Sequence, residues 1–139
     1  SVVIFTKQCG LLFLALNNSM ILSRFIDFIR CYWWQLTLFI MLLIAGGSLF
    51  PAAQLPSIPG TDKTHHFIGY GILMFPVALA KPKHFYIIAL GLIGFGGLIE
   101  LIQPYVNRYG EWLDFYANTG GLLCGYLLAR LINKWQGRK

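Results

Sequence analysis

The chain has 139 residues, of which 57% are hydrophobic and 12% are charged, and its mean hydropathy is +0.63. Because a soluble globular protein carries about 25% charged residues, this composition argues against a water-soluble fold and predicts an integral membrane protein. The net charge of +6 does not indicate nucleic-acid binding, since the basic residues flank apolar segments and form no basic face interleaved with aromatic residues.

The first nineteen residues are apolar but do not form a good membrane span, because Lys7 and Gln8 interrupt them. A signal peptide is one interpretation, although no Ala-x-Ala cleavage pattern follows. Met20 opens a segment typical of the start of a membrane protein, so we prefer to place residues 1–19 upstream of the native start or to treat them as a cloning remnant. An interfacial helix is the remaining alternative.

The next segment, residues 21–32, has polar residues at a spacing of three and predicts an amphipathic helix on the inner membrane surface. We group it into an N-terminal extension, residues 1–33, which precedes a four-helix membrane domain, residues 34–139. A spanning helix needs about 20 mainly apolar residues. Four segments of the domain qualify, at about 34–50, 62–80, 84–103 and 111–132.

Prolines mark the three connections between these segments, and Pro104 acts as a stop signal for the third. The sequence thus predicts an all-α integral membrane protein with four transmembrane helices arranged as two helical hairpins. This topology places nine Lys and Arg residues on one side and two, Lys63 and Arg108, on the other. The positive-inside rule then puts the N and C termini in the cytoplasm.

Most of the acidic residues fall at the predicted outer ends of the helices. Glu100 follows Lys83 by 17 residues, or about 26 Å of helix, which puts it near the outer boundary of the membrane core. Helical spacing places three pairs of polar residues each on one face: His66 with Tyr70, Glu100 with Gln103, and Asp114 with Asn118. These pairs can converge on one pocket at the outer leaflet.

Small residues continue the last of these faces. Asn118 is followed at helical spacing by Gly121 and Gly125, which predicts a stripe for close packing against another helix. The glycines of the third segment, Gly91 and Gly94 among them, are likewise interpreted as packing residues.

The ordered polar motifs resemble those of the VanZ-like family of small bacterial membrane proteins. The resemblance covers about residues 56–126 and rests on three motifs in order: Asp62-Lys63-x-x-His66-Phe67-x-x-Tyr70, Glu100-x-x-Gln103, and Arg108 followed by Asp114-x-x-Ala117-Asn118-x-x-Gly121. It implies a multi-pass protein of the bacterial inner membrane that belongs to the cell envelope. The family is named for a protein linked to resistance to the glycopeptide teicoplanin, and the resemblance implies no defined reaction.

Each polar residue has a functional and a structural interpretation. Asp62, Lys63 and His66 could bind an anionic head group, or Asp62 could stabilise a helix N-terminus. Arg108 could bind phosphate through its planar guanidinium group, or it could neutralise nearby carboxylates.

Glu100 could act as a general base or proton site, or it could pair with Arg108 or hydrogen-bond to Asn118. Asp114 and Glu100 could form an acid/base pair or belong to an inter-helix hydrogen-bond network. A metal is not expected, because the adjacent His65 and His66 point about 100° apart on a helix and no HExxH motif is present.

We therefore expect a ligand-binding site made of Asp62, Lys63, His66, Tyr70, Glu100, Gln103, Arg108, Asp114 and Asn118. No cofactor and no nucleic acid are expected, and the partners are membrane lipids, including a lipid-linked anionic envelope precursor. One alternative is a membrane enzyme acting on a lipid head group, with Glu100, Asp114 and His66 as candidate catalytic residues. Another is an assembly factor of the envelope. Four short helices leave little room for a transport path, so transport would require an oligomer.

Overall fold

The computed structural model describes residues 20–50, 62–108 and 110–137. These residues form helices joined by short turns, with no strand among them, so the all-α class is confirmed. A first helix, Met20–Cys31, is followed by α2 (Trp33–Leu49), α3 (Asp62–Ala80), α4 (Phe85–Ile102), the short 3₁₀ helix η2 (Gln103–Val106) and α5 (Trp112–Trp135). Residues 1–19, which were interpreted as lying upstream of the native start, are outside the described residues.

The predicted helices agree closely with the observed ones. The segment 62–80 is confirmed in full, and the last helix extends to Trp135, three residues beyond its predicted end. The third helix ends at Ile102, two residues before Pro104, as expected for a residue that cannot continue a helix. Pro76 lies inside α3, which continues through it.

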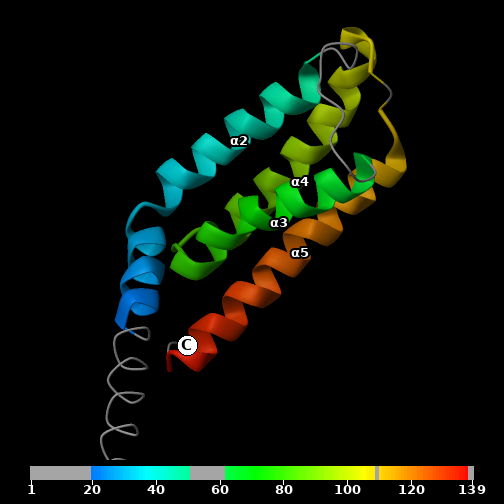
Figure 1. Cartoon of the computed structure of the whole chain (residues 1–139). Helices are drawn as coiled ribbons and strands as arrows, with labels where there is room; N and C mark the ends of the chain where they lie inside the picture. The colour runs from blue at the N-terminus through cyan, green and yellow to red at the C-terminus, as the bar shows by residue number, and fades with distance from the viewer. Residues whose placement is uncertain (1–19, 51–61, 109, 138–139) are drawn as a thin grey trace, which may run out of the picture.

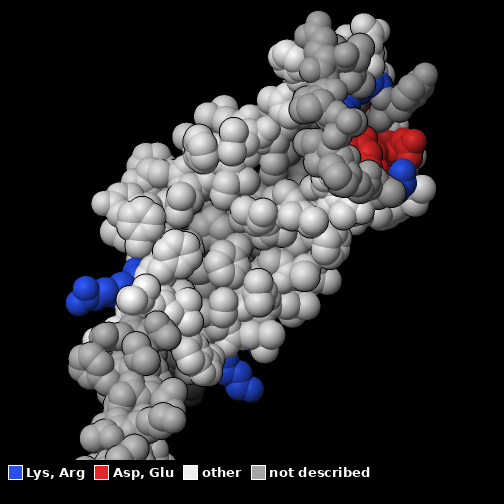
Figure 2. Space-filling model, viewed as in Figure 1, with Lys and Arg blue, Asp and Glu red and all other residues white. Residues whose placement is uncertain are grey.

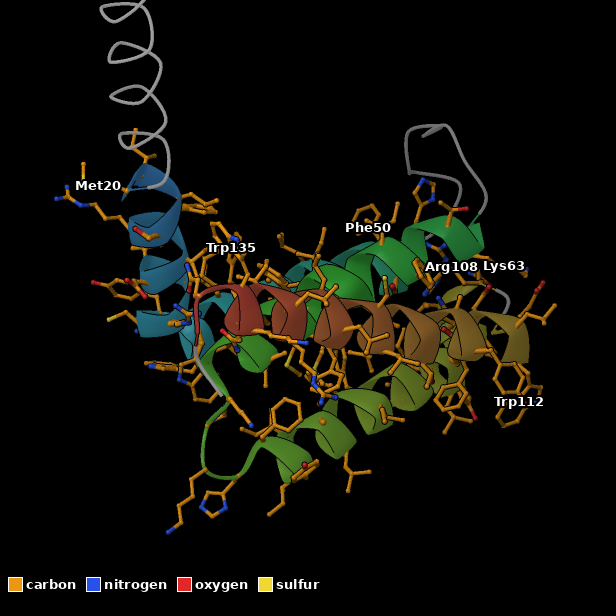
Figure 3. All side chains as sticks on the ribbon, turned by 90° about the horizontal axis from the view of Figure 1, so that it is seen from below. Met20, Phe50, Lys63, Arg108, Trp112 and Trp135 are labelled. Atoms are coloured by element: carbon orange, nitrogen blue, oxygen red, sulfur yellow. The ribbon has the colours of Figure 1, made fainter. Side chains whose placement is uncertain are left out.

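The four long helices alternate in direction along one bundle (Figure 1). Met20 and Trp135 therefore lie at one end, and Lys63, Arg108 and Trp112 lie at the other (Figure 3). The most extensive packing joins α3 and α5, which are not neighbours in the sequence, while α2 packs on α3 and α4 on α5. The α3–α5 pair is the centre of the fold and carries most of the site described below.

Glycines allow α3 and α5 to approach this closely. A methyl group added at Gly121 would overlap the carbonyl oxygen of Phe67, and one at Gly125 would overlap that of Gly71. The two backbones are thus in direct contact, which is the geometry that small residues permit between membrane helices. The predicted small-residue stripe is confirmed.

The first helix meets α2 at an angle of 76°. Its Arg30 donates hydrogen bonds to Asp27, to the Leu79 carbonyl and to Asn133, and Ile26 is buried against the bundle. The segment predicted as an amphipathic helix is therefore helical and is anchored to the end of the bundle that also holds Trp135.

Large apolar side chains are exposed along α2, α3, α4 and α5, including Phe39, Ile72, Ile87 and Leu131. Charged side chains gather toward the two ends of the molecule (Figure 2), with the visible acidic ones at one end only. By length and apolarity, the stretch Phe85–Val106 could cross a membrane, and the first helix with α2 could form a second, bent crossing. The four-span arrangement is therefore a proposal.

Candidate polar site at one end of the bundle

A chain of three buried polar side chains links α3, α5 and α4. Asn118 donates a hydrogen bond from Nδ2 to Glu100 Oε1 at 3.1 Å, and its Oδ1 lies 3.0 Å from Nδ1 of His66. Because an amide oxygen can only accept, Nδ1 of His66 is the donor. The other ring nitrogen of His66, Nε2, takes no part in this network and lies 4.0 Å from Oδ1 of Asp62.

Lys63 joins the start of α3 to the start of α5. Its Nζ donates to Glu111 Oε2 at 2.8 Å and lies 3.6 Å from Oδ1 of Asp114. The ammonium group of Lys63 therefore ties the first turn of α3 to two carboxylates at the start of α5.

Arg108 reaches the site because the chain reverses just after α4. Asn107 adopts a left-handed conformation (φ 57°) that ends η2, and asparagine tolerates this conformation better than most residues. Arg108 then donates to the Gly47 carbonyl at 3.0 Å and contacts the Asp62 carboxylate at 3.4 Å. Its side chain is only 12% exposed, so the guanidinium group joins the ends of α2 and α3.

Two further predicted site residues are fully enclosed. Gln103 donates to the Ser48 carbonyl at 3.3 Å, and Tyr70 packs beside Gly96 in the core. Among the described residues, the Tyr70 hydroxyl, Gln103 Oε1, Glu100 Oε2 and Asp114 Oδ1 accept or donate no hydrogen bond, although Lys63 Nζ lies 3.6 Å from the last of these atoms. Buried polar atoms are costly to leave unsatisfied, so these are positions at which a ligand or a water molecule could bind.

A cavity of about 310 Å³ lies between α2 and α3 at this end of the bundle. Asp62, His66 and Arg108 provide polar groups on its wall, while Leu43 and Ile44 provide an apolar side. The cavity therefore combines charged groups with a surface suited to a hydrocarbon chain.

The structure brings all nine predicted site residues to one end of the bundle, but the pairing of Arg108 with Glu100, one of the alternatives expected, is not formed. Arg108 contacts Asp62, because the turn after α4 directs it toward α2 and α3. Glu100 instead accepts from Asn118, one of the two partners expected for it.

Sequence reasoning missed three contributors to the site. Glu111, which precedes α5 and is not among the nine predicted site residues, pairs with Lys63. Gly47 and Ser48 contribute backbone carbonyls to Arg108 and Gln103. No side-chain motif could identify these carbonyls, because any residue type supplies one, whereas the charge of Glu111 and its nearness to Asp114 were visible signals.

The charges at this end do not balance. The carboxylates of Asp62, Glu100, Glu111 and Asp114 face two cations, Lys63 and Arg108, with His66 counted as uncharged. The described part of the site therefore carries an excess of two negative charges when all four carboxyl groups are ionised.

Comparison with known proteins gives no relative: no family model, no curated protein and no solved structure matches this chain.

Proposed function

We propose that this chain is a VanZ-like protein of the bacterial inner membrane, with four spans and both termini in the cytoplasm. We further propose that its polar site faces the outside and binds a lipid-linked anionic component of the cell envelope. The observation that carries the proposal is the cavity bounded by Arg108, His66 and an apolar wall at one end of an apolar bundle.

Three features support the four-span arrangement. Exposed apolar side chains cover the long helices, and an apolar surface of this extent is typical of contact with a membrane or another protein. Trp112 and Trp135, both exposed, lie at opposite ends of the bundle (Figure 3), as interfacial tryptophans do. Six of the eight described Lys and Arg residues belong to the first helix, the turn between α3 and α4 and the last turns of α5, at the end that holds Met20 and Trp135, and the site carries Lys63 and Arg108.

Cysteine labelling tests this orientation. In a variant whose native cysteines are replaced by serine, a cysteine at Glu111 should react with a membrane-impermeant maleimide in intact spheroplasts. A cysteine at Lys83 should react only after the membrane is opened, because the two residues lie at opposite ends of the bundle. Equal labelling of both positions in intact spheroplasts would contradict the four-span arrangement.

The chemistry of the cavity favours a ligand with a phosphate group and a long apolar chain. Arginine binds phosphate through two parallel hydrogen bonds, and Arg108 holds Asp62 only at 3.4–3.5 Å, which is long for a charge-assisted bond. The guanidinium group can therefore exchange this contact for a phosphate oxygen. Leu43 and Ile44 line the adjoining wall.

Binding can be measured by native mass spectrometry of the purified protein in detergent with a polyprenyl phosphate. Arg108→Gln should weaken retention about tenfold, since hydrogen bonds to charged groups contribute about 1.5–3 kcal/mol. Arg130→Gln, at the other end of the bundle, is the matched control and should leave retention unchanged. Equal loss in both variants would indicate nonspecific attraction to phosphate, and no retention by the wild type would refute the binding function.

A membrane enzyme acting on a lipid head group is a second candidate. Glu100 and Asp114 favour it, because each has a buried oxygen that accepts no hydrogen bond from the described residues, and such carboxylates can serve as a general base. Lipids and wall precursors would be compared in a strain lacking the protein, complemented with wild type or Asp114→Asn at equal protein levels. A species that accumulates and is cleared only by the wild type would support turnover, and unchanged species would refute it.

A further inference from the structure

We propose that Asp62, His66 and Asp114 bind a divalent metal ion of the zinc type at the polar site. One potential ligand atom from each of these residues lies within 4.8 Å of the other two. The donor set contains one imidazole and two carboxylates, which are ligands that zinc accepts. The expectation of no metal relied on the mutual geometry of two adjacent histidines, whereas here the second and third donors are carboxylates from α3 and α5.

The orientation of His66 is the first independent support. Its Nδ1 donates to Asn118, which in turn donates to Glu100. Metal-binding histidines almost always donate their other ring nitrogen in this way, which fixes the tautomer and directs the free lone pair. In His66 that lone pair belongs to Nε2, which faces the Asp62 carboxylate at 4.0 Å. Because Nε2 in this tautomer and the carboxylate are both acceptors, a cation between them would be stabilised by both.

The burial of Asp114 is the second support. The residue is 2% exposed, and among the described residues no donor lies within hydrogen-bond distance of its Oδ1. Lys63 Nζ is nearest at 3.6 Å and is already bonded to Glu111 at 2.8 Å. A buried carboxylate oxygen without a donor is costly, and a metal ion would supply the missing positive charge.

The geometry requires one small adjustment. Zinc lies about 2.0–2.2 Å from its oxygen and nitrogen ligands, so the donor atoms must draw somewhat closer together. The side chain of Asp62 is 54% exposed and held by Arg108 only through long contacts, so it is free to rotate toward the ion. His66 and Asp114 are already buried in place.

A divalent ion would also neutralise the excess of two negative charges. Three protein ligands leave the fourth position of a tetrahedral ion open, and this position would accept a phosphate oxygen of the lipid. That last step rests on the proposed function, whereas binding of the metal itself does not. A metal ion with an open position would explain how a site rich in carboxylates could hold an anionic head group.

The test begins with Zn²⁺ alone. After treatment with a chelator, the purified protein in detergent should bind one Zn²⁺ per chain in isothermal titration calorimetry. Asp62→Asn, at an exposed side chain where unfolding is not expected, should weaken binding at least about tenfold, and loss of the Asn118 amide that orients His66 should weaken it about 10- to 100-fold. His84→Ala, at the opposite end, is the control and should have no effect.

A variant that is expected to strengthen Zn²⁺ binding distinguishes an effect on the site from general damage to the fold. Lys63→Gln should tighten Zn²⁺ binding, because it removes the ammonium group nearest to Asp114. X-ray absorption at the zinc edge should show a single imidazole among nitrogen and oxygen ligands. Absence of stoichiometric binding, or binding unaffected by Asp62→Asn but lost in His84→Ala, would overturn the metal site.

Chelator dependence then separates this inference from the proposed function. Polyprenyl phosphate should be retained with Zn²⁺ and released when the metal is removed. Retention that is indifferent to the chelator, with Zn²⁺ bound as described, would refute the bridging role and leave the metal site standing. If the wild type binds Zn²⁺ but never retains the lipid, the proposed function fails and the metal site stands.

Discussion

Gly125→Ala should separate the two central helices and strongly reduce the amount of folded protein. The added methyl group would overlap the carbonyl oxygen of Gly71 and would lie 3.0 Å from its carbonyl carbon. These are backbone atoms, so no side-chain rotation can relieve the contact, and α3 and α5 must move apart. Overpacking of this kind costs about 1–3 kcal/mol and at times more, and we expect at least about 3 kcal/mol here.

Gly94→Ala is the matched control for this substitution. A methyl group at Gly94 meets nothing within 4 Å, and alanine is the better helix former by about 1 kcal/mol in water. Thermal unfolding in detergent, followed by size-exclusion chromatography, should therefore show a large loss for Gly125→Ala and none for Gly94→Ala. Equal stability of the two variants would mean that α3 and α5 do not touch at Gly71.

Asn118→Leu should destabilise the protein by about 2–5 kcal/mol, the second large effect. The substitution keeps the volume of the side chain similar but removes both the amide oxygen that accepts from His66 and the amide nitrogen that donates to Glu100. Each buried group left without its partner costs about 1–3 kcal/mol, and more if it is charged. Because one residue serves both groups, the two costs arise together.

Thr119→Val provides the neighbouring control on α5. Among the residues that the structure describes, its hydroxyl bonds to the Phe115 carbonyl of the same helix alone, so the expected cost is below about 1.5 kcal/mol. A double-mutant cycle between Asn118→Leu and Glu100→Ala should give a coupling free energy of about 1–3 kcal/mol. Additive effects in that cycle would show that Asn118 and Glu100 do not act as a network.

The pairing of Arg108 shows what local sequence cannot supply. Its charge and its place after α4 were visible in the sequence, but its partner depended on the turn formed by η2 and the left-handed Asn107. That turn directs the guanidinium group across to Gly47 and Asp62 on other helices. A one-residue change in the turn would direct it elsewhere, so spacing along the chain could not identify the contact.

The glycines make the same point about packing. Gly121 and Gly125 were predicted to pack closely, and they do. Gly91 and Gly94 were interpreted in the same way, but a methyl group at either meets nothing within 4 Å, so that interpretation is wrong. Composition alone cannot distinguish the two cases, because a glycine in a helix has the same local geometry whether or not another backbone lies against it.

The sequence by itself determined the helices and the end of the bundle at which most of the polar residues lie. Apolar runs of helical length bounded by proline predict the helices, since the hydrogen bonds of a helix are local. Depth along each helix places the polar residues at one end, as with Glu100 and Asp114. Only the tertiary structure decided that α3 pairs with α5 and that Asn118 joins His66 to Glu100. Those contacts span up to 52 residues of the chain, and they depend on the packing of whole helices, which no short stretch of sequence encodes.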